Sequence, residues 1–274
     1  MSMRALVGSL VVALTVAGAH ASAGEFVEIG SGTGTRGEPV RLVGYMARPS
    51  TAGPYSAVVL LHGCGGFHSS MISWADRLAR LGYAALAVDT FGPRGIDDHC
   101  AGLSMDQVED AYAALRFLTA KPFVRASHVA VMGFSMGGLS VLTALEKGFM
   151  EQRHAEKFRA GVAFYPVCQF ASGITTAPVL ILIGEADDWT RSSDCEAMVA
   201  GRAELGAPRT PGDRSSLELV LYPGAHHGFD EVELSVVPGR GITFKGHRLE
   251  YNEEAMKNSI VRVRDFLKRT IAVE

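Results

Sequence analysis

The stretch Gly133-Phe134-Ser135-Met136-Gly137-Gly138 decides the fold, because it has the form G-x-S-x-G and lies between an apolar run and a helix-forming run. Residues 129–132 before it predict a buried strand, and residues 139–145 after it predict a helix. A nucleophilic serine at such a turn adopts a strained backbone conformation, so its neighbours must be small, as Gly133 and Gly137 are. The alternative is an ordinary turn with an incidental serine, and the rest of the chain distinguishes the two.

Outward from this turn, strands and helices alternate along the chain. We expect strands at 25–29, 40–47, 57–61, 83–88, 129–132, 160–165, 179–183 and 217–222, and helices at 70–81, 105–119, 139–145, 193–205 and 252–270. Ser104 is the expected N-cap of the second helix. The glycine-rich residues 30–34 indicate a mobile hairpin turn, because they lack the Gly-Lys-Ser/Thr ending of a phosphate loop. The alternation predicts an α/β fold with a mostly parallel, doubly wound sheet of about seven or eight strands.

Residues that carry chemistry follow the later strands. In a doubly wound sheet, functional groups lie on loops after the carboxyl ends of strands. Asp187 follows the strand at 179–183, and His227 follows the strand at 217–222. The chain order Ser135, Asp187, His227 is that of the triad of the α/β-hydrolase fold, in which the imidazole is the base and the carboxylate orients it. We therefore expect that fold and that triad.

Each partner of the serine has a neighbour of the same type. We favour Asp187 over Asp188 as the acid of the triad. The alternative is that both aspartates lie on the surface and serve only to cap a turn or a helix. His227 is favoured over His226 because Gly228 leaves room beside it. Adjacent histidines lack the i, i+4 spacing of a helical zinc site, so we expect no metal and no organic cofactor.

The glycine-rich segment His62-Gly63-Cys64-Gly65-Gly66 follows the strand at 57–61. Glycines there allow backbone N–H groups to turn inward and form half of an oxyanion hole, although a plain tight turn is the alternative. We assign the N–H groups of Cys64 and Met136 as the two donors. His62 is expected to be structural, because a base at that position precedes the nucleophile in the chain.

Four motifs taken together resemble the dienelactone hydrolase family. They are Leu61–Gly66, Gly133–Gly138, Gly184–Asp187 and Ala225–Phe229, and the resemblance runs from about residue 37 to the C-terminal helix. It implies that His227 is the catalytic histidine and Asp187 the catalytic acid. It also implies that Arg94 matches an arginine that binds a substrate carboxylate in that family, with a solvated loop arginine as the alternative.

The chain also departs from the family pattern. The family uses a cysteine nucleophile where this chain has Ser135, and the family's glutamate near the resting cysteine has no counterpart beside Gly63. The serine favours general ester hydrolysis over hydrolysis of a dienelactone.

The expected function is that of a serine hydrolase that cleaves carboxylic esters through an acyl-enzyme. A polyester or cutinase-like hydrolase and a lactonase are narrower alternatives, followed by a serine peptidase. A catalytically silent binding protein on the same fold is the alternative from another class, against which the complete triad argues. We expect Phe67, Arg94 and Trp189 to contact a small ester or lactone, and residues 230–246 to form either a lid or a surface excursion.

Residues 1–23 have the pattern of a signal peptide, with Arg4, an apolar segment and small-x-small sites near Ala23. Residues 24–274 are then a single domain of a periplasmic or secreted protein. Four cysteines allow three disulfide pairings, and four free thiols are the alternative. In the α/β-hydrolase sheet the strands before Cys64 and Cys100 are neighbours, as are those before Cys168 and Cys195. We therefore prefer these two pairings.

Composition limits the remaining partners. The chain has 26 basic and 29 acidic residues, a formal charge of −3, and no basic cluster interleaved with aromatic residues. Nucleic acid is therefore not an expected partner. No stretch after the signal peptide approaches the length of a membrane span, so no membrane association is expected after cleavage. The expected state is a monomer or a homodimer.

Overall fold

The computed structural model describes residues 24–101, 104–148, 150–202, 216–236 and 241–272. The predicted signal peptide lies outside these ranges, as do residues 203–205 of one predicted helix and residues 237–240 of the predicted lid. None of the helices in the described ranges is long and apolar enough to cross a bilayer.

The described residues form an eight-stranded sheet in the order β1-β2-β4-β3-β5-β6-β7-β8. Its strands are β1 (Glu25–Thr33), β2 (Pro39–Ala47), β3 (Tyr55–Leu61), β4 (Ala84–Asp89), β5 (Val124–Phe134), β6 (Ala160–Phe164), β7 (Val179–Gly184) and β8 (Leu217–Tyr222). β1 and β2 are antiparallel to their neighbours, and all other pairs are parallel. The central strands are buried on both faces, which is why they are continuous apolar runs. The predicted mostly parallel α/β sheet is confirmed.

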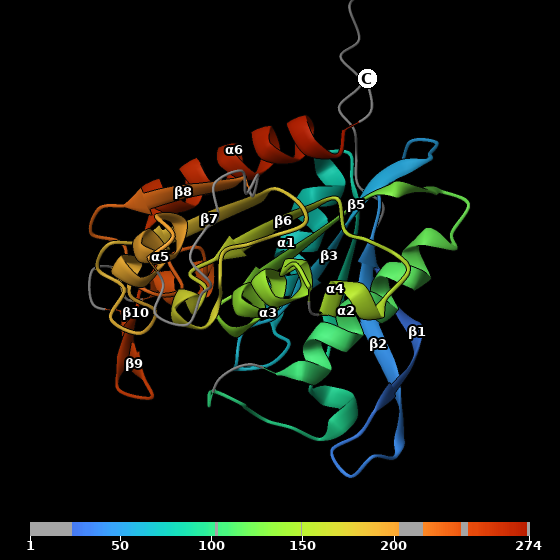
Figure 1. Cartoon of the computed structure of the whole chain (residues 1–274), viewed down its shortest axis with the longest axis horizontal. Helices are drawn as coiled ribbons and strands as arrows, with labels where there is room; N and C mark the ends of the chain where they lie inside the picture. The colour runs from blue at the N-terminus through green and yellow to red at the C-terminus, as the bar shows by residue number, and fades with distance from the viewer. Residues whose placement is uncertain (1–23, 102–103, 149, 203–215, 237–240, 273–274) are drawn as a thin grey trace, which may run out of the picture.

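Helices cover both faces of the sheet (Figure 1). They are α1 (Ser69–Arg80), α2 (Met105–Thr119), α3 (Met136–Leu145), α4 (Met150–Arg153), α5 (Ser192–Val199) and α6 (Glu253–Thr270), with 3₁₀ turns η1 (Gly92–Arg94), η2 (Cys168–Phe170) and η3 (Val232–Val236). α1 packs on β2, β3 and β4 and α6 on β6 and β7, while α2 and α3 pack on β5 from the other face. Ser104 caps α2 as predicted, because its side chain accepts a hydrogen bond from the Gln107 N–H.

The glycine-rich residues after Ile29 differ from the prediction. They do not form the turn but continue β1 to Thr33, with an irregularity in the pairing between Glu28 and Gly30. Gly30 has φ +153°, so it absorbs this bulge without strain. The turn lies farther on, where the Gly34 N–H donates to the Glu38 carbonyl. The hairpin was predicted correctly, but its turn was placed too early. Gly30 and Gly32 belong to β1, and glycines do not add to the alternation of apolar and polar residues that marks a strand.

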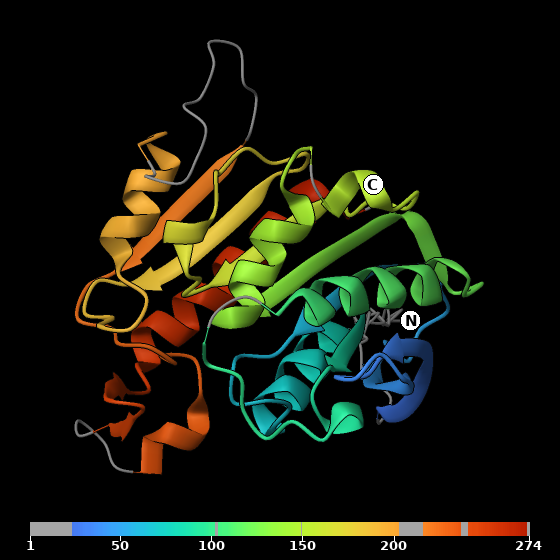
Figure 2. The same cartoon turned by 60° about the horizontal axis from the view of Figure 1, so that its bottom comes forward.

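Residues 228–236 and 241–249, between β8 and α6, form a separate segment at one end of the molecule (Figure 2), called here the covering segment. Within it, β9 (Ile242–Phe244) and β10 (His247–Leu249) pair as a two-stranded antiparallel sheet. The segment ends at Leu249, which forms an isolated bridge with His227 in the loop after β8. The Glu250 N–H also donates to the His227 carbonyl at 3.1 Å. Both ends of the covering segment therefore lie beside His227.

Candidate active site

Ser135 lies at the turn between β5 and α3 with φ 53° and ψ −115°. The glycines on either side are required by backbone contacts. A Cβ atom at Gly133 would lie 2.2 Å from the Gly137 carbonyl oxygen, and one at Gly137 would lie 2.4 Å from the Leu61 carbonyl oxygen. The steric reason for small residues at these two positions, inferred from the sequence, therefore holds in the structure.

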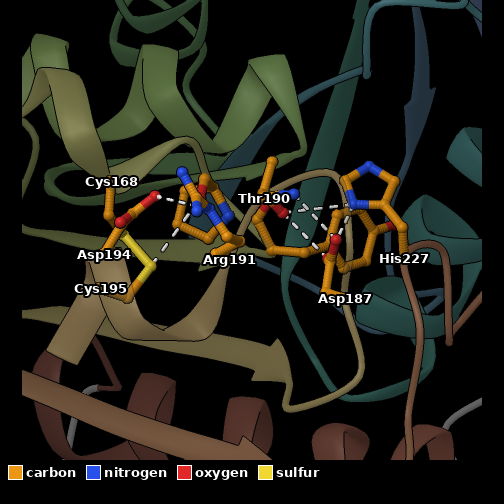
Figure 3. Close-up of a disulfide and its surroundings, with 9 residues drawn as sticks. Cys168, Asp187, Thr190, Arg191, Asp194, Cys195 and His227 are labelled. Carbon is orange, nitrogen blue, oxygen red and sulfur yellow. Dashed lines mark hydrogen bonds and ion pairs between the residues drawn. A yellow bond between two sulfur atoms is a disulfide. The ribbon is translucent and has the colours of Figure 1, made fainter. Parts of the chain in front are cut away.

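Ser135, His227 and Asp187 form one hydrogen-bonded line. His227 Nε2 lies 2.9 Å from Ser135 Oγ, and His227 Nδ1 lies 2.8 Å from Asp187 Oδ2. Both partners of the serine are buried, with 3% of His227 and 5% of Asp187 exposed. Figure 3 shows Asp187 between His227 and the start of α5. The geometry allows His227 to take a proton from Ser135 while Asp187 fixes the ring through the other nitrogen.

The loop after β7 holds the Asp187 carboxylate. Oδ1 accepts hydrogen bonds from the N–H groups of Trp189 at 2.9 Å and Thr190 at 2.8 Å. Burial by itself raises the pKa of Asp187, but His227 and these N–H donors outweigh it, so the pKa lies below its ordinary value. Asp187 is therefore a stable anion, which suits a group that orients an imidazole.

The two neighbouring residues lie outside this line. Asp188 is exposed and accepts a hydrogen bond from the Arg248 N–H at 3.2 Å. His226 turns towards Glu250, with 4.0 Å between His226 Nε2 and the carboxylate. Of each adjacent pair, the residue favoured from the sequence is thus the one in the hydrogen-bonded line with Ser135.

The oxyanion donors assigned from the sequence are the backbone N–H groups of Met136 and Cys64. Met136 is the first residue of α3, and the first N–H groups of a helix have no partner within it. Cys64 lines the same cavity as Ser135, and within the described part of the chain its N–H donates to no other residue. Both assigned donors are thus available to an oxygen atom bound beside the serine.

His62 lies behind the oxyanion segment and is fully buried. Its Nε2 accepts a hydrogen bond from the Thr90 N–H at 3.2 Å, and its Nδ1 lies 2.7 Å from the Gly63 carbonyl oxygen. Burial lowers the pKa of His62 to about 4, so the ring is neutral and joins two loops. These contacts fit the structural role expected for it.

A cavity of about 190 Å³ opens beside Ser135 and His227. Its walls are mainly apolar and include Phe134 and Met71, while Trp189 lies with its ring centroid 5.0 Å from that of His227. The covering segment contributes Ile242, Phe244 and Leu249. Of the two alternatives for residues 230–246, the described part therefore forms a cover over the cavity. The position of Trp189 fits the substrate contact predicted for it.

Phe67 and Arg94 do not reach this cavity, and the predictions for them require correction. The Phe67 ring lies 5.9 Å from that of Phe26, at the edge of β1. The Arg94 guanidinium is buried and forms hydrogen bonds of 2.7 and 2.9 Å with both carboxylate oxygens of Asp110. It also donates to the carbonyls of Thr33 and Thr90. Arg94 therefore joins β1, the loop after β4 and α2, and it has no donor directed at a substrate.

Two acidic residues close to His227 in the chain, Asp230 and Glu231, were not singled out from the sequence. Tyr165 donates to Asp230 Oδ1, and the Trp74 indole N–H donates to Asp230 Oδ2, each at 2.7 Å. Burial raises the pKa of Asp230 despite these donors. Glu231, the next residue, lines the cavity. The only signal in the sequence is the acidic pair directly after Phe229, which is also common in surface turns.

Two disulfides connect loops at the carboxyl edge of the sheet. Cys64 is bonded to Cys100, and Cys168 to Cys195. The preceding strands β3 and β4, and β6 and β7, are neighbours in the sheet, as the preferred pairing required. Figure 3 shows the second bridge beside Arg191 and Asp194, at the end of the loop that carries Asp187. The prediction of both pairings is confirmed.

Comparisons with known proteins agree with this architecture. The model of the dienelactone hydrolase family matches residues 42–271. A Bradyrhizobium protein named "Probable 2-oxo-3-(5-oxofuran-2-ylidene)propanoate lactonase" is 29% identical over 221 residues, which cover 72% of this chain and 82% of that protein.

Solved structures share the fold. A dienelactone hydrolase-like promiscuous phosphotriesterase from metagenomic libraries has a TM-score of 0.68 at 22% identity, covering 92% of this chain and all of that chain. Esterase 2 of Thermogutta terrifontis, phosphorylated by paraoxon, has a TM-score of 0.62 at 19% identity, covering 92% of this chain and 96% of that chain. By the match of the family model over most of its length, the chain belongs to the dienelactone hydrolase family.

Proposed function

We propose that this protein is an exported serine hydrolase that cleaves small carboxylic esters or lactones through an acyl-enzyme. The observation that carries the proposal is the hydrogen-bonded line from Ser135 Oγ through His227 to Asp187, at 2.9 and 2.8 Å, beside a cavity. Membership of a hydrolase family supports it independently.

In the proposed mechanism, Ser135 Oγ attacks the carbonyl carbon while His227 Nε2 accepts the hydroxyl proton. Asp187 stabilises the resulting imidazolium. The carbonyl oxygen becomes an oxyanion that accepts hydrogen bonds from the N–H groups of Cys64 and Met136. His227 then protonates the leaving alkoxide, and the ester bond breaks. A water molecule attacks the acyl-enzyme with His227 as base, which releases the acid and restores Ser135.

The cavity supports a small substrate. Its volume of about 190 Å³ is below the ~300–1,000 Å³ typical of pockets for drug-sized ligands. A short acyl group or a small lactone therefore suits it better than a segment of a polyester. A lactone is the second candidate, because the Bradyrhizobium relative is named as a lactonase.

Export is part of the proposal. The two disulfides suggest a compartment that is not reducing, and residues 1–23 have the pattern of a cleaved signal. We propose residues 24–274 as a single mature domain. Intact-mass measurement of protein recovered from the periplasm or medium tests this, and a mass that retains residues 1–23 contradicts cleavage.

A hydrolysis panel tests the catalytic proposal. Short and long nitrophenyl esters, a small lactone and a soluble polyester fragment are offered to the wild type and to Ser135→Ala. We expect turnover of the short esters or the lactone, and a loss of at least about 10³-fold in kcat in the variant. Ser69→Ala, which changes an exposed serine bonded to Glu233, is the matched control and retains activity.

Covalent labelling separates the hydrolase from a silent binding protein. An organophosphonate is expected to add to the Ser135-containing peptide of the wild type and not to Ser135→Ala, as read by mass spectrometry. Equal activity in the wild type and Ser135→Ala overturns the mechanism. A folded wild type that neither turns over the panel nor becomes labelled favours the binding protein.

A further inference from the structure

Glu231 places a carboxyl group in the wall of the active-site cavity. The side chain is half-buried, and within the described ranges it makes no hydrogen bond or ion pair. Its neighbour Asp230 differs in this respect, because both oxygens of Asp230 are bonded to Trp74 and Tyr165. Neither the triad nor the oxyanion hole uses Glu231, so it is a polar group in contact with the space where a substrate binds.

The described lining of the cavity offers no side chain with a permanent positive charge. No lysine or arginine of the described residues lines it. Arg94, the cation expected there from the family resemblance, is bonded to Asp110 and buried elsewhere. Lys245, on the covering segment, pairs instead with Asp98 at 3.1 Å. Among the described residues, a carboxylate carried by a substrate would therefore be desolvated without a lysine or arginine beside it, which is unfavourable.

We propose that Glu231 is a specificity-determining residue that makes this active site select uncharged esters and lactones over those that carry a carboxylate. The inference rests on the proposed hydrolase function and names its substrate class. Protonated Glu231 donates a hydrogen bond to a neutral oxygen of the substrate, and ionised Glu231 repels an anion in the same cavity.

The groups that face Glu231 determine when it is charged. On its own segment these are the anions Asp230 and Glu233, and burial together with them raises the pKa of Glu231 to about 8. From other elements, His68 precedes α1 and lines the cavity, His227 follows β8, and Tyr165 follows β6. Arg77 of α1 lies over the Trp74 ring at 5.5 Å and is not part of the cavity wall. Discrimination against anions is therefore expected to increase as the pH rises through about 8.

A pair of matched esters tests this inference. Monomethyl succinate and dimethyl succinate have the same carbon chain and differ by one carboxylate against one methyl ester. Methanol release gives kcat/KM for each, and the ratio of anionic to uncharged ester is compared at pH about 6.5 and about 9.5. The triad serves both substrates, so its own titration cancels in the ratio.

In the wild type we expect a ratio below one at the lower pH and a further fall of about tenfold at the higher pH. In Glu231→Gln, an isosteric change, the fall is expected to shrink to less than about twofold. Glu185→Gln removes an exposed carboxylate after β7, outside the cavity, and serves as the matched control that behaves as the wild type.

A wild-type ratio of one or more at both pH values overturns the inference, as does an equal fall in Glu231→Gln. The wild-type titration needs no variant, so a folding defect in Glu231→Gln does not remove the test. Failure of the proposed function has a different signature. In that case neither ester is hydrolysed by folded protein, or Ser135→Ala hydrolyses both at the wild-type rate, and this inference falls with it.

Discussion

Thr190 contacts both carboxylate oxygens of Asp187. Its N–H donates to Oδ1 at 2.8 Å, and its hydroxyl oxygen lies 2.9 Å from Oδ2, which is also the oxygen that faces His227. The hydroxyl has one proton, and the Tyr165 carbonyl at 3.0 Å is the other acceptor within reach. Thr190 therefore positions the acid of the proposed triad beside the imidazole, because its hydroxyl oxygen also lies 3.3 Å from His227 Nδ1.

Thr190→Val is expected to lower kcat by about tenfold, the equivalent of roughly 1.4 kcal/mol, while KM changes little. The variant keeps the shape and the N–H donor but removes the hydroxyl from the buried carboxylate. Steady-state kinetics on a short ester gives the two parameters separately. Thr190→Ser retains the hydroxyl and is expected to restore most of kcat. A loss of stability with unchanged kcat would assign Thr190 a structural role only.

Ser135→Gly is expected to unfold at the same temperature as Ser135→Ala or higher. Glycine usually lowers stability by about 0.5–1 kcal/mol relative to alanine. At φ 53° the alanine is strained and the glycine is not, so the usual order is offset or reversed. Thermal denaturation compares the two. Ala113→Gly, in the middle of α2, is the control and shows the usual loss of about 1 kcal/mol.

Arg94→Met is expected to lower the free energy of unfolding by about 3–5 kcal/mol, because it leaves Asp110 buried without its partner. Urea denaturation gives this value. The double variant Arg94→Met with Asp110→Leu is expected to recover part of the loss, since no unpaired charge remains. A rise in KM that is confined to carboxylate-bearing esters, without loss of stability, would restore the substrate-binding role predicted from the family.

Replacing Cys168 and Cys195 together by serine is expected to lower the free energy of unfolding by about 3–4 kcal/mol in the chain-entropy model. The bridge spans 27 residues and closes the loop between η2 and α5. Unfolding in urea, with and without reductant, compares the variant with the wild type. Reductant is expected to destabilise the wild type further than the variant, because the wild type has both bridges to lose. Alkylation of these cysteines in urea-unfolded wild type without reductant would contradict the bridges.

Relative to the wild type, Glu231→Gln is expected to be more stable at high pH than at low pH. The pKa of Glu231 is raised from 4.5 to about 8, so the folded state binds a proton that the unfolded state loses. The stability contributed by this group is complete below pH 4.5 and is lost as the pH rises through about 8. The melting temperature of the variant minus that of the wild type is therefore expected to increase between these limits. An unchanged difference would contradict the raised pKa.

The sequence predicted most of the sheet because its strands are continuous apolar runs and its elbow has a backbone constraint that only glycines satisfy. Ser135, Asp187 and His227 were singled out for the same reason, since each follows a strand that is easy to locate. The predicted positions of the strand ends were less accurate. β5 begins at Val124 rather than at residue 129, because exposed residues at its start do not continue the apolar run.

Side-chain direction was the information that the sequence lacked. Arg94 lies on the 3₁₀ turn that follows β4, yet its guanidinium points to Asp110 on α2. Phe67 is next to cavity residue His68 but packs outward against Phe26. Residues 242–249 form a short hairpin of mixed polarity, so no periodic pattern marked β9 or β10. Glu231 was missed because the sequence does not show that Asp230 is buried and that Glu231 beside it lines the cavity.

The covering segment begins and ends at His227, where Leu249 forms its bridge and the Glu250 N–H donates to the His227 carbonyl. A loop whose two ends lie close together tolerates insertions and exchanges. A change in its length does not move the residues at its ends, and it costs little loop-closure entropy. Segments of other lengths and compositions can therefore be grafted between residues 230 and 249 while β5, β7 and their loops stay as they are. We expect sequence differences among relatives to concentrate in the covering segment. We expect the same of substitutions selected in laboratory evolution for new substrates.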